Sequence, residues 1–408
     1  MTHSRLLLVL PILLALTATA VSQPLGTDLI ASDWNGVLYR IPPAGPMVTM
    51  GTYGRILWSM RMDSDNQHVI AAISASGGFL ARINLATGSA TTVQAIPSPF
   101  SVMVNQDGDY LVGTLNKDLL KVKRDGSGVS TILSAMPAVP VPTRDKDSGD
   151  WILYSKKNEI LRYTSDWSIV LATIAHSSIY VYDMIQDPQT PDVYLAASNV
   201  ARLDPRTNSV SVLTAVGPGI LGDRGINTDR APGASGAMLY VSSPALNNPT
   251  TLSSVLRLDR SGTVLGTVAT LPAPVTGIVY EQSRNLGPRL QTFGNDRIIH
   301  VDFPTDARKA YIVALGYSGF YPGVTLPDGR TISLNFDPLV FLTAGTSLPP
   351  ALMQNIGYLD AQGRAVVTFN TNTLPVPSGM LIWAVCVTLD SAAPLGISQI
   401  SAPVLFVL

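Results

Sequence analysis

The fold class is decided by residues 102–127, which read VMVNQDGDYLVGTLNKDLLKVKRDGS. Three apolar segments alternate there with an Asp-Gly turn, a short polar turn and a second Asp-Gly turn, and a fourth apolar segment follows at Val129–Leu133. Asp-Gly between alternating apolar residues is typical of tight turns that join antiparallel strands. The segment therefore predicts one four-stranded antiparallel sheet.

The same order of strands and turns recurs along the chain at intervals of roughly 35–45 residues. Seven central strand pairs can be placed, the first at Leu29–Ser32 with Val37–Ile41 and the last at Arg289–Phe293 with Arg297–Asp302. Four antiparallel strands at this period are typical of the blades of a β-propeller. We predict an all-β chain with a seven-bladed propeller, and six blades is the alternative.

The first repeat lacks an innermost strand, which suggests how the ring closes. An open propeller would expose unpaired strand edges between its first and last blades. We therefore expect the segment around Thr27–Ser32 to pair with the final blade near Arg289–Asp302.

The composition also favours strands and argues against a polyanionic partner. Only two glutamates and seven lysines occur, so strong surface helix formers are scarce, whereas 33 glycines and 30 prolines suit many turns. The 27 basic and 28 acidic residues give a net charge of −1. Such a balance carries no electrostatic signature of nucleic-acid binding.

The first 22 residues are typical of a secretory signal peptide. Arg5 precedes an apolar run from Leu6 to Leu16, and small residues at 18–22 offer cleavage sites. The alternative is an uncleaved anchor helix, although the run is short for a membrane span. We expect a secreted or extracytoplasmic protein, either periplasmic or at the cell surface, with no other membrane span and a monomeric state.

The chain changes character after Pro304. We assign residues 1–22 to the signal peptide, 23–304 to the propeller and 305–408 to a β-sandwich-like domain able to fold by itself. In the last segment we expect the turn Asp360–Gly363 to join two strands as a hairpin, and we expect a strand at Val340–Thr343. Cys386, the only cysteine, lies in an apolar strand and is predicted to be buried and inert.

Residues 105–112, NQDGDYLV, followed by 119–126, LLKVKRDG, resemble an NHL-type propeller repeat. They are also similar to repeats of the virginiamycin B lyase and gluconolactonase-like propellers. This resemblance covers residues 27–303 and implies a propeller. The C-terminal segment resembles a module of secreted proteins of planctomycete-like bacteria, which implies an extracytoplasmic location.

The sequence offers few residues for chemistry. His68, His176 and His300 are not spaced as metal ligands, and no residue set matches a nucleophile or phosphate-binding motif. Aspartates cluster at Asp63–Asp65, at Asn105–Asp109 and at Asp145–Asp150. Such clusters suit either turns or Ca²⁺, so we expect no cofactor and keep Ca²⁺ or another divalent metal as the alternative.

The resemblance implies a metal-dependent lyase or lactonase site in the propeller channel. Lactonase-like propellers use an acidic ligand, commonly glutamate, from an early blade, but this chain has no glutamate before Glu159. Lyase-like sites use a late histidine near a glutamate, for which Glu281 and His300 are the candidates here, without a matching motif. Catalytic residues stay unassigned, and we favour a non-enzymatic protein.

Binding residues are predicted from the loops that share one propeller face. These are the loops entering each blade and those between its two middle strands. Aromatic, arginine and aspartate side chains there suit recognition of an extracellular protein or glycan, although the aromatic rings could instead pack between blades. The candidates are Trp34, Tyr53, Arg55, Trp58, Phe100, His176, Tyr182, Asp183, Asp223 and Arg224.

Overall fold

The computed structural model describes most of the chain from residue 28 onward. Its described residues are 28–408 apart from 43–44, 64–67, 75–76, 106–107, 146–147, 157, 177–180, 188–189, 198, 215–225, 229–238, 244–252, 281–288, 294–295, 329, 346–354, 371–376, 378–379, 402 and 408. The predicted signal peptide therefore lies outside the described residues.

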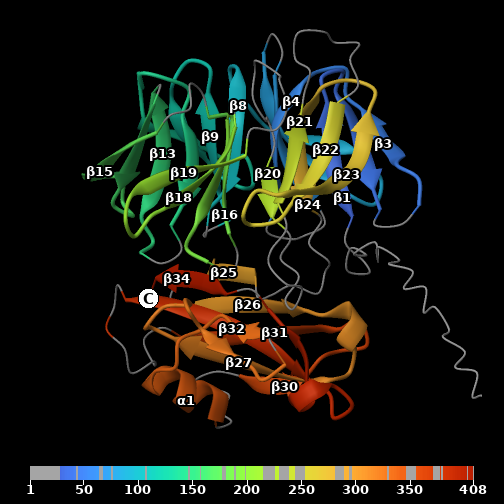
Figure 1. The fold of residues 1–408 in the computed structure, drawn as a ribbon, viewed down its shortest axis with the longest axis vertical. Coiled ribbons are helices and arrows are strands. Elements are labelled where there is room, and N and C mark those ends of the chain that lie inside the picture. Colours follow the sequence, from blue (N-terminus) through green and yellow to red (C-terminus); the bar gives the residue numbers. More distant parts are fainter. Residues whose placement is uncertain are drawn as a thin grey trace, which may run out of the picture.

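The chain is all-β in class, and its first part consists of four-stranded antiparallel sheets (Figure 1). We number these sheets as blades and list each from the inner to the outer strand. The first three blades are β24 (Val275–Tyr280), β1 (Leu29–Asp33), β2 (Val37–Ile41) and β3 (Val48–Thr52); β4 (Leu57–Met62), β5 (His68–Ile73), β6 (Phe79–Asn84) and β7 (Ala90–Ala95); and β8 (Pro99–Val104), β9 (Tyr110–Thr114), β10 (Leu119–Val122) and β11 (Val129–Leu133).

Three further blades follow in chain order. They are β12 (Val141–Arg144), β13 (Trp151–Lys156), β14 (Glu159–Tyr163) and β15 (Val170–Ala175); β16 (Asp183–Gln186), β17 (Val193–Ala196), β18 (Val200–Asp204) and β19 (Ser209–Thr214); and β20 (Ile226–Thr228), β21 (Leu239–Ser243), β22 (Ser253–Leu258) and β23 (Val264–Leu271). The inner strands β4, β8, β12, β16, β20 and β24 contact one another in this cyclic order, so the blades form a closed ring.

Burial within a blade follows the distance from the ring axis. The second strands β9 and β17 are buried at every position because neighbouring blades cover both of their faces. The outer strands β3, β7 and β11 have mainly exposed or half-buried positions. The Asp-Gly turn before β11 also packs against the preceding blade: Gly126 has φ +75°, and a Cβ there would lie 2.3 Å from the Val93 carbonyl oxygen.

The described residues contain six four-stranded blades, which is the number given as the alternative to seven. The difference from seven lies in the last predicted pair, β25 (Arg289–Phe293) and β26 (Asp296–Asp302). β26 pairs along its whole length with β31 (Arg364–Asn370), so these strands form a sheet with the C-terminal part of the chain. The turn between β25 and β26 has the pattern of a blade turn, but the next strand of their sheet, β31, comes from the C-terminal part of the chain.

Ring closure uses the N-terminal strand, as predicted, but with a different partner. β1 pairs with β24, in a register that sets Leu29 opposite Tyr280 and Ser32 opposite Gly277. The expected partner near Arg289–Asp302 is wrong because that segment pairs with β31. The first blade is therefore assembled from both ends of the propeller sequence.

The described C-terminal part contains a three-stranded sheet, a five-stranded sheet, a two-stranded hairpin and short helices. One sheet has the order β25, β26, β31. The other contains β30 (Ile356–Tyr358), β27 (Ala310–Gly316), β32 (Leu381–Leu389), β33 (Ile397–Ile400) and β34 (Val404–Val407). The remaining elements are the hairpin β28 (Val324–Thr325) and β29 (Thr331–Ile332), the 3-10 helices η1 (Pro304–Asp306) and η3 (Pro394–Gly396), and α1 (Pro338–Gly345).

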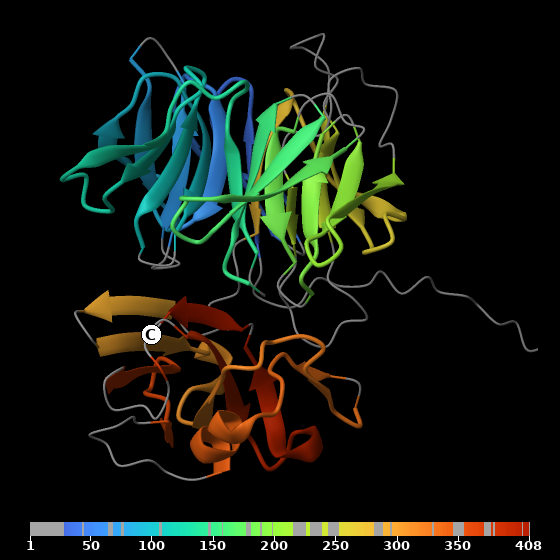
Figure 2. The same ribbon diagram turned by 90° about the vertical axis from the view of Figure 1, so that its left-hand side faces the viewer.

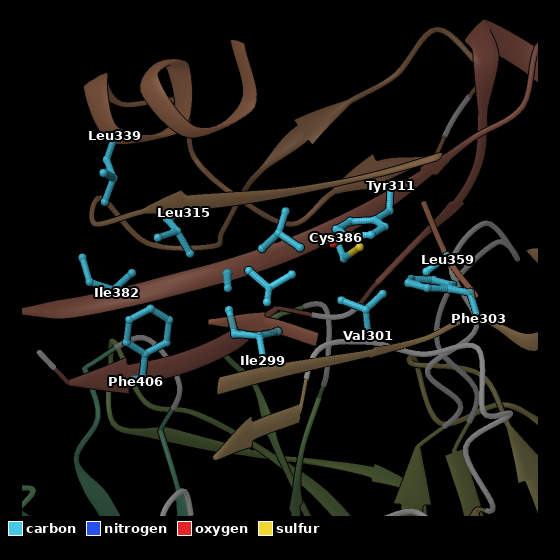
Figure 3. Packing of buried hydrophobic residues seen from close by; sticks show 13 residues of the cluster. Ile299, Val301, Phe303, Tyr311, Leu315, Leu339, Leu359, Ile382, Cys386 and Phe406 are labelled. Atoms are coloured by element: carbon cyan, nitrogen blue, oxygen red, sulfur yellow. The ribbon is translucent and has the colours of Figure 1, made fainter. Parts of the chain in front are cut away.

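A hydrophobic core lies between these two sheets (Figure 3). Ile299 and Val301 of β26 meet Ile382 and Cys386 of β32 there. Cys386 is fully buried, as predicted, and burial raises the pKa of its thiol well above the ordinary value. A thiol that stays protonated is a poor nucleophile, which fits an inert packing role.

The segment expected to be a strand at Val340–Thr343 is instead part of α1. Asp337 caps this helix, since its Oδ1 accepts hydrogen bonds from the backbone N–H groups of Leu339 (2.9 Å) and Val340 (3.0 Å). Pro338 suits the first helical position, where its missing N–H costs nothing. An Asp-Pro pair before the apolar run was the available signal for a helix start.

Removing the closing strand tests its importance. Deletion of residues 23–36 from the mature chain removes β1, which lies between β24 and β2. We expect the propeller to lose its cooperative thermal unfolding transition, or to melt at least about 10 °C lower, because two strands lose their hydrogen-bond partner and buried face. Calorimetry with circular dichroism measures this, and a melting temperature within one or two degrees of the parent would refute it.

Candidate functional site

The propeller has two faces with different surroundings. The upper face carries the loops that enter each blade and the loops between second and third strands. The lower face carries the other turns and lies toward the C-terminal sheets in both views (Figures 1 and 2). Two contacts support this placement: the Arg206 guanidinium lies 5.1 Å from the Tyr321 ring centre, and Leu381 lies beside Gly149.

Three aromatic rings from successive blades form a contiguous series at the upper face, which we call the aromatic arc: Trp34, Trp58 and Phe100. The ring centres of Trp34 and Trp58 are 5.5 Å apart in an edge-to-face arrangement. Those of Trp58 and Phe100 are 5.3 Å apart and tilted by 34°. All three side chains are half-buried. Such geometry is favourable for aromatic pairs and still leaves ring surface for a partner.

Local irregularities in the inner strands position two of these rings. Leu57 pairs with Ile73 and Ser59 with Ala72, so the ladder between β4 and β5 skips Trp58. The ladder between β8 and β9 skips Phe100 in the same way. A bulge of this kind turns the extra side chain away from the regular pleat. Trp58 and Phe100 occupy equivalent positions in their blades, and the same kind of bulge reorients both side chains.

Trp34 is held by a buried turn in the first blade. The Asp33 carboxylate accepts hydrogen bonds from the N–H groups of Asn35 (2.9 Å) and Val37 (3.0 Å) and from the Tyr39 hydroxyl (2.9 Å). Gly36 has φ +73°, and a Cβ there would lie 2.2 Å from the Arg55 carbonyl oxygen. The turn therefore packs directly against the loop that enters the second blade.

The other predicted binding residues that the structure describes do not form part of the aromatic arc. Arg55 is exposed; its guanidinium lies 5.8 Å from the ring centre of Phe79 in β6, and its backbone packs against Gly36 in the Trp34 turn. Tyr53 instead packs between blades: its hydroxyl donates to the Gly88 carbonyl oxygen (2.6 Å), and burial raises its pKa to about 12. Asp223 and Arg224 lie outside the described residues.

Two candidates belong to the fourth and fifth blades. His176 is buried, with its ring edge toward Tyr154 at 6.0 Å, and burial lowers the pKa of its imidazole. Tyr182 is half-buried just before β16, and its backbone N–H donates to the Ala196 carbonyl oxygen. The structure thus brings together Trp34, Trp58 and Phe100, with the backbone of Arg55 against the Trp34 turn, but not the whole predicted set.

The partner of Asp183 is Arg61, a residue that was not among the candidates predicted from the sequence. The Asp183 carboxylate forms an ion pair with Arg61, which lies in the inner strand β4 of a different blade. The available signal was a charged residue near the end of an otherwise largely apolar inner strand, Leu57–Met62.

The aspartate clusters of the lower face are engaged with basic side chains. Asp63 pairs with Arg82 (2.7 Å) and Arg124 (3.3 Å), and Asp145 pairs with Arg162 (3.0 Å). Within the residues that the structure describes, no group of three or more His, Cys, Asp or Glu side chains is placed to hold a metal ion. These carboxylates act as ion-pair partners between strands and blades; Ca²⁺ binding stays an untested alternative.

Comparisons with known proteins agree with the fold. No family model matches the sequence, and no curated protein matches it. Among solved structures, a chain of the nidogen/laminin complex is similar, with a TM-score of 0.50 and 15% identity over 63% of this chain and 99% of that chain. TolB from Acinetobacter baumannii gives a TM-score of 0.49 and 14% identity over 63% of this chain and 66% of that chain.

At 15% identity, the similarity to the nidogen/laminin chain concerns the fold alone. It supports the β-propeller that the closed ring of blades already shows. In the described part of the chain, no helix is long and apolar enough to cross a membrane.

His176 predicts a pH dependence of stability. Because burial lowers its folded-state pKa, the unfolded chain binds a proton more readily once the pH falls below about 6.5. The free energy of unfolding should therefore fall as the pH is lowered from about 7.5 to 5, and His176→Gln should reduce this slope. Denaturant titrations at several pH values measure it. His300→Gln is the control, and an equal slope in both variants would contradict the assignment.

Proposed function

We propose that this chain is an extracytoplasmic, non-catalytic binding protein whose upper propeller face recognises a protein partner through the aromatic arc. The observation that carries the proposal is the contiguous series Trp34, Trp58 and Phe100, with exposed Arg55 on the loop that packs against the Trp34 turn. Trp and Arg are enriched among the residues that contribute most to protein–protein binding, whereas Lys, Glu and Asp are depleted in interface centres.

The arrangement of the two faces supports the choice of the upper one. C-terminal elements lie along the lower face, where Arg206 contacts Tyr321. The arc lies on the opposite face, where strand irregularities occur at two of its three residues, Trp58 and Phe100. The similar propeller chain is part of a nidogen/laminin complex, so that protein occurs with a protein partner. A protein partner therefore suits this face better than a glycan.

Several finer points belong to the same proposal. Secretion rests on the signal-like residues 1–22, and the NHL-type subtype rests on the repeat at 105–126. We propose a domain boundary between β24 and β25, because β25 pairs with β26 and β26 in turn pairs with the C-terminal strand β31. The C-terminal part is then a β-sandwich-like module with a helix on one side.

The alternative function is a metal-dependent lyase or lactonase. Metal analysis of the purified protein, together with turnover assays on small substrates, tests it.

Alanine substitutions in the arc test the proposed face. The mature chain, residues 23–408, would be used to capture partners from fractionated extracellular protein and on a glycan array. We expect Trp34→Ala and Phe100→Ala to weaken binding of a captured protein about 30-fold or more, as for central interface aromatics. Titration calorimetry measures the affinity.

Trp167→Ala is the matched control. Trp167 is also a half-buried tryptophan, stacked on Trp151 with ring centres 4.8 Å apart, but its turn lies on the lower face. It should leave the affinity unchanged. Equal losses in Trp34→Ala and Trp167→Ala would refute the upper face as the binding site. Selective capture of a glycan would show that the partner is a glycan and not a protein. Clean turnover of a small substrate without stable binding would favour the alternative of a lyase or lactonase.

A further inference from the structure

An ion pair joins two blades on opposite sides of the ring. Arg61 lies in β4, the inner strand of the second blade, and Asp183 begins β16, the inner strand of the fifth. The inner strands follow the cyclic order β4, β8, β12, β16, β20, β24, so β4 and β16 are three places apart in either direction. A contact between them must cross the central channel.

The contact is two-pronged and shielded from water. Both terminal nitrogens of Arg61 donate to the Asp183 carboxylate, one of them at 3.2 Å to Oδ2. The same guanidinium also donates to the carbonyl oxygens of Met184 (3.0 Å) and Met60 (2.8 Å). The side chains are only 13% and 5% exposed. Charge-assisted, forked hydrogen bonds in a poorly hydrated place are strong and geometrically specific.

We propose that the Arg61–Asp183 pair is a cross-channel lock that closes the propeller lumen and couples opposite halves of the ring. Blades otherwise contact mainly their neighbours, so a propeller can loosen between any two of them. A link across the axis resists such opening from either side. It also occupies the lumen at the height of the inner strands, so a partner binds over the upper face without passing a segment through the channel.

Breaking one half of the lock leaves the other charge shielded and unpaired. Such losses in buried pairs are large, whereas replacing both partners by apolar residues is often close to neutral. We expect Arg61→Met and Asp183→Asn each to lower the melting temperature of the propeller by about 6–12 °C. The double variant R61M/D183M should lose much less than the sum of the two single effects. Calorimetry of the mature chain gives the three values.

Hydrogen exchange distinguishes a lock from a merely local contact. In Arg61→Met, backbone amides should exchange faster in both β4 and β16, although these strands belong to opposite blades. Arg202→Met is the matched control, because Arg202 pairs with Asp192 within the fifth blade at 4.0 Å and is 43% exposed. It should shift the melting temperature by less than about 2 °C, as exposed pairs contribute little.

The melting temperatures and the exchange rates distinguish a cross-channel lock from a local contact. Any one of three results would overturn the proposal. The single variants would lose no more melting temperature than Arg202→Met, the losses of melting temperature would be additive in the double variant, or faster amide exchange would be confined to β4. If Arg61→Met does not fold, Arg61→Lys replaces it: the lysine keeps the charge but not the fork, so it should give a smaller fall in melting temperature. An Arg61→Lys variant as stable as the parent would count against the lock.

Discussion

The hydrogen-bonded joint between β1 and β24 is the constraint on which the propeller depends. Ser32 and Thr276, which are 244 positions apart in sequence, lie side by side there with their hydroxyl oxygens 3.1 Å apart. The joint completes the first blade and so gives every blade two neighbours. Closure covers the faces that the first and last blades would otherwise expose, and β1 at the joint is accordingly buried at every position.

Neighbouring blades are held by polar contacts as well as by apolar cores. Val102 N–H donates to Ser59 Oγ and Ser101 Oγ donates to the Pro140 carbonyl oxygen, so inner strands are linked from blade to blade. Farther out, Arg124 reaches Asp63 of the preceding blade, and Arg260 reaches Asp187. The buried carboxylates of Asp63 and Asp187 are tolerable because each has such a cationic partner. The acidic turns thus contribute to the packing of blades.

The same ring geometry gives the two faces different side chains and neighbours. The lower face is the side of the acidic turns and of the C-terminal sheets (Figure 1). The upper face carries the three aromatic rings of the arc. Each ring in the arc comes from a different blade, so the arc exists only because the blades are fixed side by side. Rigid presentation of aromatic side chains lowers the entropy cost of binding, which is the physical advantage of a propeller as a recognition scaffold.

Local sequence alone determined the all-β class, the repeating blades and the Asp-Gly turns, because alternation and turn chemistry act over a few residues. Tertiary structure decided the pairings. The turn at Asp360–Gly363 forms, yet β30 and β31 beside it join different sheets, and β26 pairs with β31 rather than completing a blade. The Trp58 bulge and the Arg61–Asp183 contact also arise only when distant strands meet. Apolar strands of similar pattern are interchangeable locally, so their partners are chosen by burial across the whole chain.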